Sequence, residues 1–181
     1  MFLRPLQSLM ATLLTLLLVS SALADNKIVI DANTESALDM LRGHASGADE
    51  LLDKAVGVLV FPDVVKMGFG GGGQFGEGSL LVNGKPAAYY VTAGAPYGLP
   101  EGAQSKSQVI LFMTEQSLQD FRNSQGWKVG IDGSVSLVEV GEGGSLNTTS
   151  AAGSMLGFIF SDEGLMHNLT LKGGKITRIA R

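Results

Sequence analysis

The chain lacks cysteine altogether, and this absence excludes several kinds of chemistry. Without thiols it can form no disulfide, thiolate nucleophile, iron–sulfur cluster or cysteine-ligated zinc site, and it cannot carry a lipid on an N-terminal cysteine. Charged residues are also scarce, at 17% of the 181 residues, against about 25% in typical domains. The formal net charge of −4 gives no global field that favours nucleic acid or an anionic membrane. Binding to either would need a local basic patch.

Long apolar runs are also lacking, apart from one run between Leu9 and Val19 that is too short to span a bilayer. Arg4 precedes this run, and the small residues Ala22-Leu23-Ala24 after it fit a cleavage site. The pattern is typical of a secretory signal peptide, with a membrane anchor as the alternative. We expect residues 1–24 to be removed and residues 25–181 to form one domain. Export without cysteine fits a bacterial envelope, so we expect the protein to be periplasmic or secreted.

The rest of the chain shows the periodicities of two helices and seven or eight short strands. Apolar residues at three- and four-residue steps predict a helix over 34–53, capped by Asn33 or Thr34 and weakened at Gly43 and Gly47. A second helix is predicted over 114–123. The strand candidates are 55–61 (ended by Pro62), 76–82, 87–92, 107–113, 134–140, 155–160, 165–171 and 175–179.

Turn signals, rather than crossover helices, separate the strands. Asn83-Gly84 and Gly173-Gly174 each predict a hairpin. The glycine run from Gly68 to Gly73 formally matches G-x-G-x-x-G but precedes another strand, so it favours bulges and tight curling over nucleotide binding. We therefore predict a single compact α+β domain. Its antiparallel sheet is curled, glycine-rich and barrel-like, with an N-terminal helix and one further short helix.

No pattern of residues specifies catalysis. The chain has neither a P-loop motif nor G-x-S-x-G, and its only histidines, His44 and His167, are far apart in the sequence. The carboxylates are scattered. We therefore expect no enzyme activity, no metal and no cofactor. The alternative is an enzyme with an unrecognised site that uses His167 or Asp162.

Several basic residues stand next to aromatic ones, a pairing suited to a lipid–water interface. If they converge on one face, their ammonium and guanidinium groups would meet headgroup phosphates while aromatic rings insert shallowly. The alternative is a set of solvated strand edges guarded by lysine. The last ten residues form the most basic stretch, with four cations and no acid. The candidate lipid-binding residues are Lys66, Phe69, Lys106, Arg122, Trp127 and Lys128.

An ordered series of short motifs from Lys54 onward resembles the SYLF family, also known as the Ysc-type actin-binding domain. The motifs are Lys54 to Pro62, Gly68-Phe69 with Gly72-Gly73, Phe75 to Gly78 with Leu80-Leu81, Gly98-Leu99 with Gly102 to Ser105, Val109 to Thr114, Gly133 to Val135, and Ser161 to Leu165. The resemblance covers nearly the whole chain after the predicted signal peptide, and it accounts for the excess of glycine.

The resemblance implies a non-enzymatic lipid-binding module. Eukaryotic relatives bind phosphoinositide membranes, and some bind actin filaments. For an exported bacterial member we expect binding to an anionic phospholipid or phosphoinositide-type headgroup, with no nucleic-acid partner and no transmembrane segment after signal cleavage. The alternative is a protein-interaction module for an envelope partner. Pro100, Glu101, His167-Asn168 and Lys172 depart from the usual family pattern, so a different specificity is expected if they shape a ligand site.

Overall fold

The computed structural model describes residues 27–66, 73–94, 105–138, 145–146, 152–166, 171 and 173–181. The predicted signal peptide, Phe69 and His167 lie outside these residues. Within them the chain forms a helix over 27–44, called here the N-terminal helix, and the two helices α2 (Ala48–Lys54) and α3 (Glu115–Asn123). The strands are β1 (Gly57–Lys66), β2 (Gln74–Val82), β3 (Lys85–Gly94), β4 (Ser105–Phe112), β5 (Trp127–Lys128), β6 (Ser136–Leu137), β7 (Met155–Ser161), β8 (Gly164–Leu165) and β9 (Lys175–Ile179).

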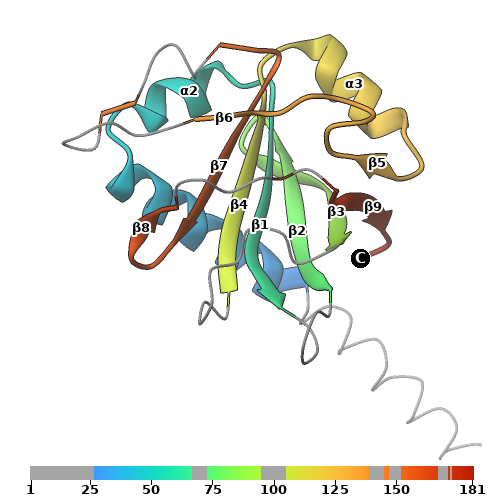
Figure 1. Cartoon of the computed structure of the whole chain (residues 1–181), viewed down its shortest axis with the longest axis horizontal. Coiled ribbons are helices and arrows are strands. Elements are labelled where there is room, and N and C mark those ends of the chain that lie inside the picture. Colours follow the sequence, from blue (N-terminus) through green and yellow to red (C-terminus); the bar gives the residue numbers. More distant parts are fainter. Residues whose placement is uncertain are drawn as a thin grey trace, which may run out of the picture.

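The strands form one curled sheet in the order β5-β9-β3-β2-β1-β4-β7-β6, with β8 paired to β7 (Figure 1). Neighbouring strands are antiparallel except β6 and β7, which are parallel. The prediction of an α+β fold built on a curled antiparallel sheet is confirmed. No helix in the described part of the chain is both long and apolar enough to cross a membrane.

The two faces of the sheet bury two different cores. Side chains alternate along β1, so Val58 and Val60 pack with Leu41 of the N-terminal helix on what we call the helix face. Leu59 and Phe61 point to the opposite side, which we call the aromatic face. The aromatic face is covered by α3, whose Phe121 ring centre lies 4.9 Å from Tyr90, 4.9 Å from Phe112 and 5.6 Å from Trp127.

The helix predicted over 34–53 is divided in two. Gly47, with a φ of 95°, separates the N-terminal helix from α2, as the weakening at glycine predicted. The predicted caps were wrong, because Asn33 and Thr34 lie inside the N-terminal helix. Ile30 is buried and extends the apolar stripe by a further turn, so the helix continues upstream of the predicted start.

Strand β1 continues through Pro62, where the sequence predicted that it would end. Its register against β4 shifts between Phe61 and Val64, so proline lies in a bulge and its missing N–H leaves the ladder intact. The facing strand β2 has glycine where this bulge closes on it. A Cβ at Gly78 would lie 2.1 Å from the carbonyl oxygen of Val60. Glycine inside β2 therefore permits the close approach of the β1 backbone, as the glycine-rich sequence predicted.

The two predicted hairpins have opposite outcomes. Asn83 and Gly84 have φ values of 52° and 71° and join β2 to β3, as predicted. The hairpin at Gly173-Gly174 was wrong, because β9 pairs with β3 and β5 while β8 pairs with β7. Pairing beside β3 buries Ile176 in the core of the aromatic face. A hairpin formed with the preceding residues alone would not require this burial.

The second helix was predicted correctly. Thr114 is its N-cap, and its side-chain oxygen accepts a hydrogen bond of 3.2 Å from the backbone N–H of Ser117. The helix buries Leu118 and Phe121 against the sheet and carries Arg122 in its last turn. This cap and this apolar pair fix the position of the Arg122 guanidinium, which contributes to the site below.

Candidate functional site

Four exposed cations gather where β9, β5 and the last turn of α3 meet. They are Arg122, Lys128, Lys175 and Arg178, called here the basic edge. The pairing of β9 with both β3 and β5 is what assembles them, because it brings the basic C-terminal stretch beside residues 122–128. These elements lie on the same side of the sheet in Figure 1, near the end marked C.

Lys128 and Lys175 face each other directly across two paired strands. Their neighbours Trp127 and Ile176 are also paired and point into the aromatic core, so the two lysines point to the opposite side of the sheet. Like charges in directly opposed positions repel and destabilise a strand pair. An anion between or beside the two ammonium groups would relieve this repulsion.

Arg122 and Arg178 lie on the aromatic side of the same edge, beside the buried hydroxyl of Tyr90. Burial raises the pKa of Tyr90, and the positive charges of Arg178 and then Arg122 oppose this rise. The guanidinium groups of Arg178 on β9 and Arg122 on α3 therefore both stabilise the ionised form of the Tyr90 hydroxyl. Among the described residues, no carboxylate forms an ion pair with any of the four cations of the basic edge.

An exposed apolar side chain stands beside this edge. Ile131 is 76% exposed at the apex of the turn that follows β5. The turn is held by a 3.0 Å hydrogen bond from the N–H of Asp132 to the carbonyl of Lys128, and by a 2.7 Å bond from the N–H of Lys128 to the Asp132 carboxylate. A further bond of 2.8 Å joins the N–H of Gly130 to the carbonyl of Gly133. The Ile131 side chain is thus exposed to solvent at the apex of a turn that three hydrogen bonds hold in place.

A shallow groove of about 510 Å³ continues the edge along β3 and β9. Lys27, Arg178 and Arg181 line it together with Tyr89. The Lys27 ammonium lies 5.4 Å from the centre of the Tyr89 ring, close enough for a cation–π contact. Arg181 is paired with Glu77, so the groove is less free to accept an anion than the four cations of the basic edge.

The phenol of Tyr89 connects this groove to the N-terminal helix. Its hydroxyl donates to the Asp31 carboxylate, 2.9 Å from each oxygen. Burial raises the pKa of Tyr89 to about 12, and the hydrogen bond and negative charge of Asp31 add to this rise. The contact fixes one end of the helix on the sheet beside Lys27.

The structure brings only two of the six predicted lipid-binding residues together, Arg122 and Lys128. Trp127 is 2% exposed and Lys106 is 1% exposed, so the prediction that both are available at the surface was wrong. Trp127 is buried because β5 pairs with β9 and turns the indole under α3. Lys66 ends β1, away from the basic edge, and Phe69 lies outside the described residues.

Sequence reasoning missed Lys175, Arg178 and Ile131 as site residues. The basic C-terminal stretch was noticed, but its neighbours depend on the non-local pairing of β9. An isolated isoleucine between Gly130 and Asp132, in a segment rich in turn residues, was a signal that could have identified Ile131. The alternative enzyme site gains no support, since Asp162 is exposed and the described residues contain no cluster of metal-ligating side chains.

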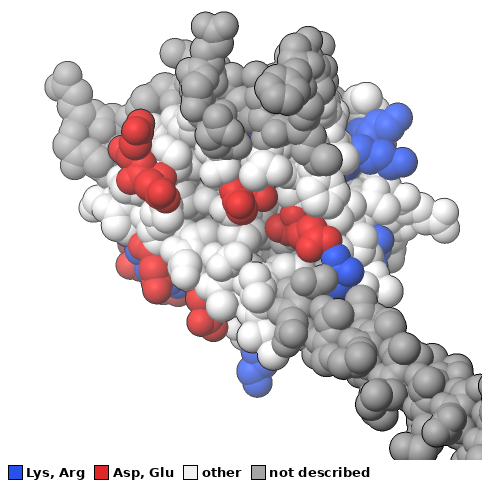
Figure 2. Space-filling model, turned by 90° about the horizontal axis from the view of Figure 1, so that it is seen from below, with Lys and Arg blue, Asp and Glu red and all other residues white. Residues whose placement is uncertain are grey.

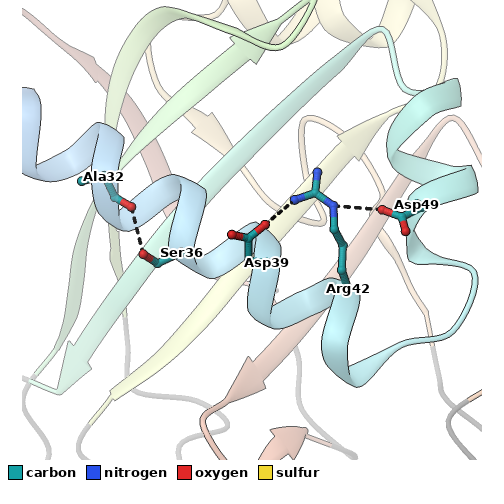
Figure 3. Close-up of polar contacts among 5 residues, drawn as sticks. All are labelled: Ala32, Ser36, Asp39, Arg42 and Asp49. Atoms are coloured by element: carbon teal, nitrogen blue, oxygen red, sulfur yellow. Dashed lines mark hydrogen bonds and ion pairs between the residues drawn. The ribbon is translucent and has the colours of Figure 1, made fainter.

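The opposite charge dominates the helical part of the molecule. Asp39, Asp49 and Glu50 lie on the N-terminal helix and α2, where Arg42 binds both aspartates (Figure 3). Seen from below, acidic side chains are spread over the left and centre of the surface, and most of the Lys and Arg atoms lie to the right (Figure 2). The arrangement separates charge within a chain whose net charge is only −4.

Comparison with known proteins is consistent with a binding surface. Residues 93–180 match the model of the Ysc84 family, described as "Las17-binding protein actin regulator". This segment contains all of β4, all of α3 and all four residues of the basic edge. No curated protein matches the chain. The family is one of binding domains, and the match confirms the resemblance over residues 93–180, whereas the motifs between residues 54 and 81 lie outside it.

Proposed function

We propose that this chain, which belongs to the Ysc84 (SYLF) family through residues 93–180, is an exported module that binds anionic phospholipid surfaces through its basic edge. The single observation that carries the proposal is the convergence of four exposed cations from three elements on one edge of the sheet. The family supports a binding module in general terms, and the charge of this edge favours an anionic partner.

Docking would be edge-on. Side chains alternate between the two sides of a strand, so Lys128 and Lys175 project from one side of the edge and Arg178 from the other. Only an approach along the edge allows both sets to reach headgroup phosphates at once. Each cation near an anionic membrane contributes about 1 kcal/mol, an attraction that salt screens.

Ile131, rather than an aromatic ring, would insert shallowly into the membrane. It is exposed, adjacent in sequence to the basic edge, and held on a turn that needs no rearrangement. Insertion of one isoleucine removes apolar surface from water without opening the core. The buried Trp127 would instead hold β5 in place, and so position Lys128 and Ile131 together.

The test is co-sedimentation of the full chain with vesicles of phosphatidylcholine alone and of an equal mixture of phosphatidylcholine and phosphatidylglycerol. We expect selective binding to the mixed vesicles that weakens as salt is raised. The double variant Lys175→Glu/Arg178→Glu should lower the partition coefficient at least roughly 30-fold, since two contributions of about 1 kcal/mol are lost and repulsion is added. Ile131→Ser should weaken binding further without changing its salt dependence.

The matched control is Arg42→Glu/Lys54→Glu, which makes the same change in net charge on the helical side. This control should bind as the unmodified chain does, because long-range charge alone is screened within about 10 Å at ordinary ionic strength. Equal loss in both double variants would mean that net charge, and not the basic edge, controls binding. Absence of binding to either kind of vesicle would overturn the proposal.

A protein partner is the second candidate, favoured by the family description, which names a Las17-binding actin regulator. The same edge would then meet an acidic protein surface. Selective recovery of one envelope protein with the unmodified chain, lost with Lys175→Glu/Arg178→Glu and with no vesicle binding, would support this alternative.

A further inference from the structure

Two buried donors stand side by side on β4. Among the described residues, the ammonium Nζ of Lys106 and the amide Nε2 of Gln108 have no hydrogen-bond partner, although the two residues are only 1% and 3% exposed. They are two positions apart on one strand, so their side chains project from the same face. This is the aromatic face, because Gln108 lies opposite Phe61 and Lys106 lies opposite Val64.

The described residues that flank this pair do not compensate the charge. Phe61, Val64 and Ile159 of the flanking strands are buried and apolar. Burial alone lowers the pKa of Lys106 to about 8, so at neutral pH the ammonium is charged in the protein interior. Buried polar groups are nearly always paired, and an unpaired buried cation is the most costly exception.

The pair is also close to the surface. Ser105, the residue before Lys106, begins β4 and is exposed, so the ammonium lies one residue from the end of the sheet. Ser107 is fixed by a 2.7 Å hydrogen bond from its hydroxyl to the carbonyl of Pro62 in the bulge of β1. The strand is therefore anchored at Ser107, between the two donors, and the first donor lies one residue from the exposed end of the strand.

We propose that Lys106 and Gln108 form an internal oxyanion-binding site that takes a phosphate or carboxylate group. Nζ offers three N–H donors and Nε2 offers two, whereas an oxyanion supplies only acceptors. A charge-assisted bond to Lys106 would satisfy the ammonium, and the amide would satisfy a second oxygen of the same group. This site is separate from the basic edge and does not depend on the proposed membrane binding.

The probes are inorganic phosphate, acetate, and vesicles that contain phosphatidic acid, because a phosphate group can come from solution or from a lipid. The ammonium of Lys106 in the full chain, labelled with ¹⁵N at Nζ, would be followed by NMR as each probe is added. We expect a saturable change in its signal and a rise in its pKa. Saturation by inorganic phosphate assigns a free anion, and a response to phosphatidic acid vesicles alone assigns a lipid headgroup.

Calorimetric titration with phosphate provides the second measurement. Lys106→Met should reduce the affinity at least roughly tenfold, since a bond to a charged donor is lost. Gln108→Met should reduce it less. Lys54→Met, which removes an exposed lysine of α2 outside both proposed sites, should leave it unchanged.

The two proposals fail in different ways. Lys175→Glu/Arg178→Glu should keep the phosphate response after losing vesicle binding, and Lys106→Met should keep salt-sensitive vesicle binding after losing the phosphate response. A Lys106 signal that no probe changes would overturn the oxyanion site and indicate that water satisfies the two donors. Because that titration uses the unsubstituted residue, the result stands even if Lys106→Met fails to fold.

Discussion

The helical side and the basic edge carry their charges in opposite ways. On the helical side Arg42 donates from Nη1 to Asp39 at 2.8 Å and from Nε to Asp49 at 2.9 Å, which joins the N-terminal helix to α2 (Figure 3). On the basic edge Lys128 faces Lys175 across a strand pair. On the helical side Arg42 is paired within the chain, whereas the four cations of the basic edge have no carboxylate partner among the described residues.

Secondary structure explains part of this difference. On a helix the neighbours of a residue lie three and four positions away, so a local sequence can place acid beside base, as it does for Arg42 with Asp39. On a strand the nearest neighbour is set by register with a distant segment. The facing of Lys128 and Lys175 is therefore a property of the fold, and repulsion there is tolerated because Trp127 and Ile176 hold the strands from the core side.

Among the substitutions that test the difference between the helical side and the basic edge, Trp127→Ala should have the largest effect. Removing the indole that is packed against Phe121 should lower the free energy of unfolding by about 3–5 kcal/mol, measured by urea denaturation. It should also release β5, so that Lys128 no longer faces Lys175. Ile131→Ala, four residues along the chain, is the exposed control and should change stability by less than about 0.5 kcal/mol.

The fluorescence of Trp127 gives an independent measurement, since it is the only tryptophan in the chain. The ring is already in an apolar environment, so addition of anionic vesicles should leave its emission wavelength unchanged. A blue shift on vesicle binding, with the fold intact, would place the indole at the membrane and contradict its buried position.

Local signals predicted much of the fold, and non-local pairing accounts for most of what they missed. The cap at Thr114, the turn at Asn83-Gly84 and the apolar run at the start of β1 act over a few residues, and the structure confirms each of them. The passage of β1 through Pro62 was missed because it needs a bulge on one strand and Gly78 on another.

The site was harder to predict than the fold. The sequence identified Lys128 because it stands beside Trp127, yet that indole is buried. An aromatic residue next to lysine on a strand points to the opposite face, so adjacency in sequence did not indicate a shared surface. Burial of Lys106 had no local signal at all, since only the position of β4 inside the sheet encloses it.

The pH dependence of stability should report the burial of the Lys106 ammonium. Burial lowers the pKa of Lys106 from 10.5 to about 8, so between these values the unfolded chain holds a proton that the folded chain has lost. The free energy of unfolding should therefore rise between about pH 8 and pH 10, towards a limit of about 3 kcal/mol. Lys106→Met should abolish this rise, as measured by urea denaturation at each pH.

Above pH 10 the sign reverses. The pKa of Tyr89 is raised to about 12 by burial and by Asp31, and burial also raises that of Tyr90, so the folded chain keeps protons that the unfolded chain loses. Stability should then fall as the pH approaches 12, and Tyr89→Phe should reduce this fall. A rise that persists in Lys106→Met would show that its ammonium is solvated and would remove the physical basis for an internal anion site.

Arg42→Ala should have the smallest effect, although Arg42 makes two ion pairs. Its side chain and both carboxylates are exposed to solvent, and such pairs contribute at most about 1 kcal/mol each and less as salt is added. We expect the free energy of unfolding to fall by less than about 1 kcal/mol at low salt, and by less still at high salt. Vesicle binding by this variant should be unchanged, because Arg42 already has its anions within the chain. If Arg42→Ala instead weakened vesicle binding as much as Arg178→Ala, pairing within the chain would not be what distinguishes the two regions. That result would contradict the proposal that the basic edge is the binding surface.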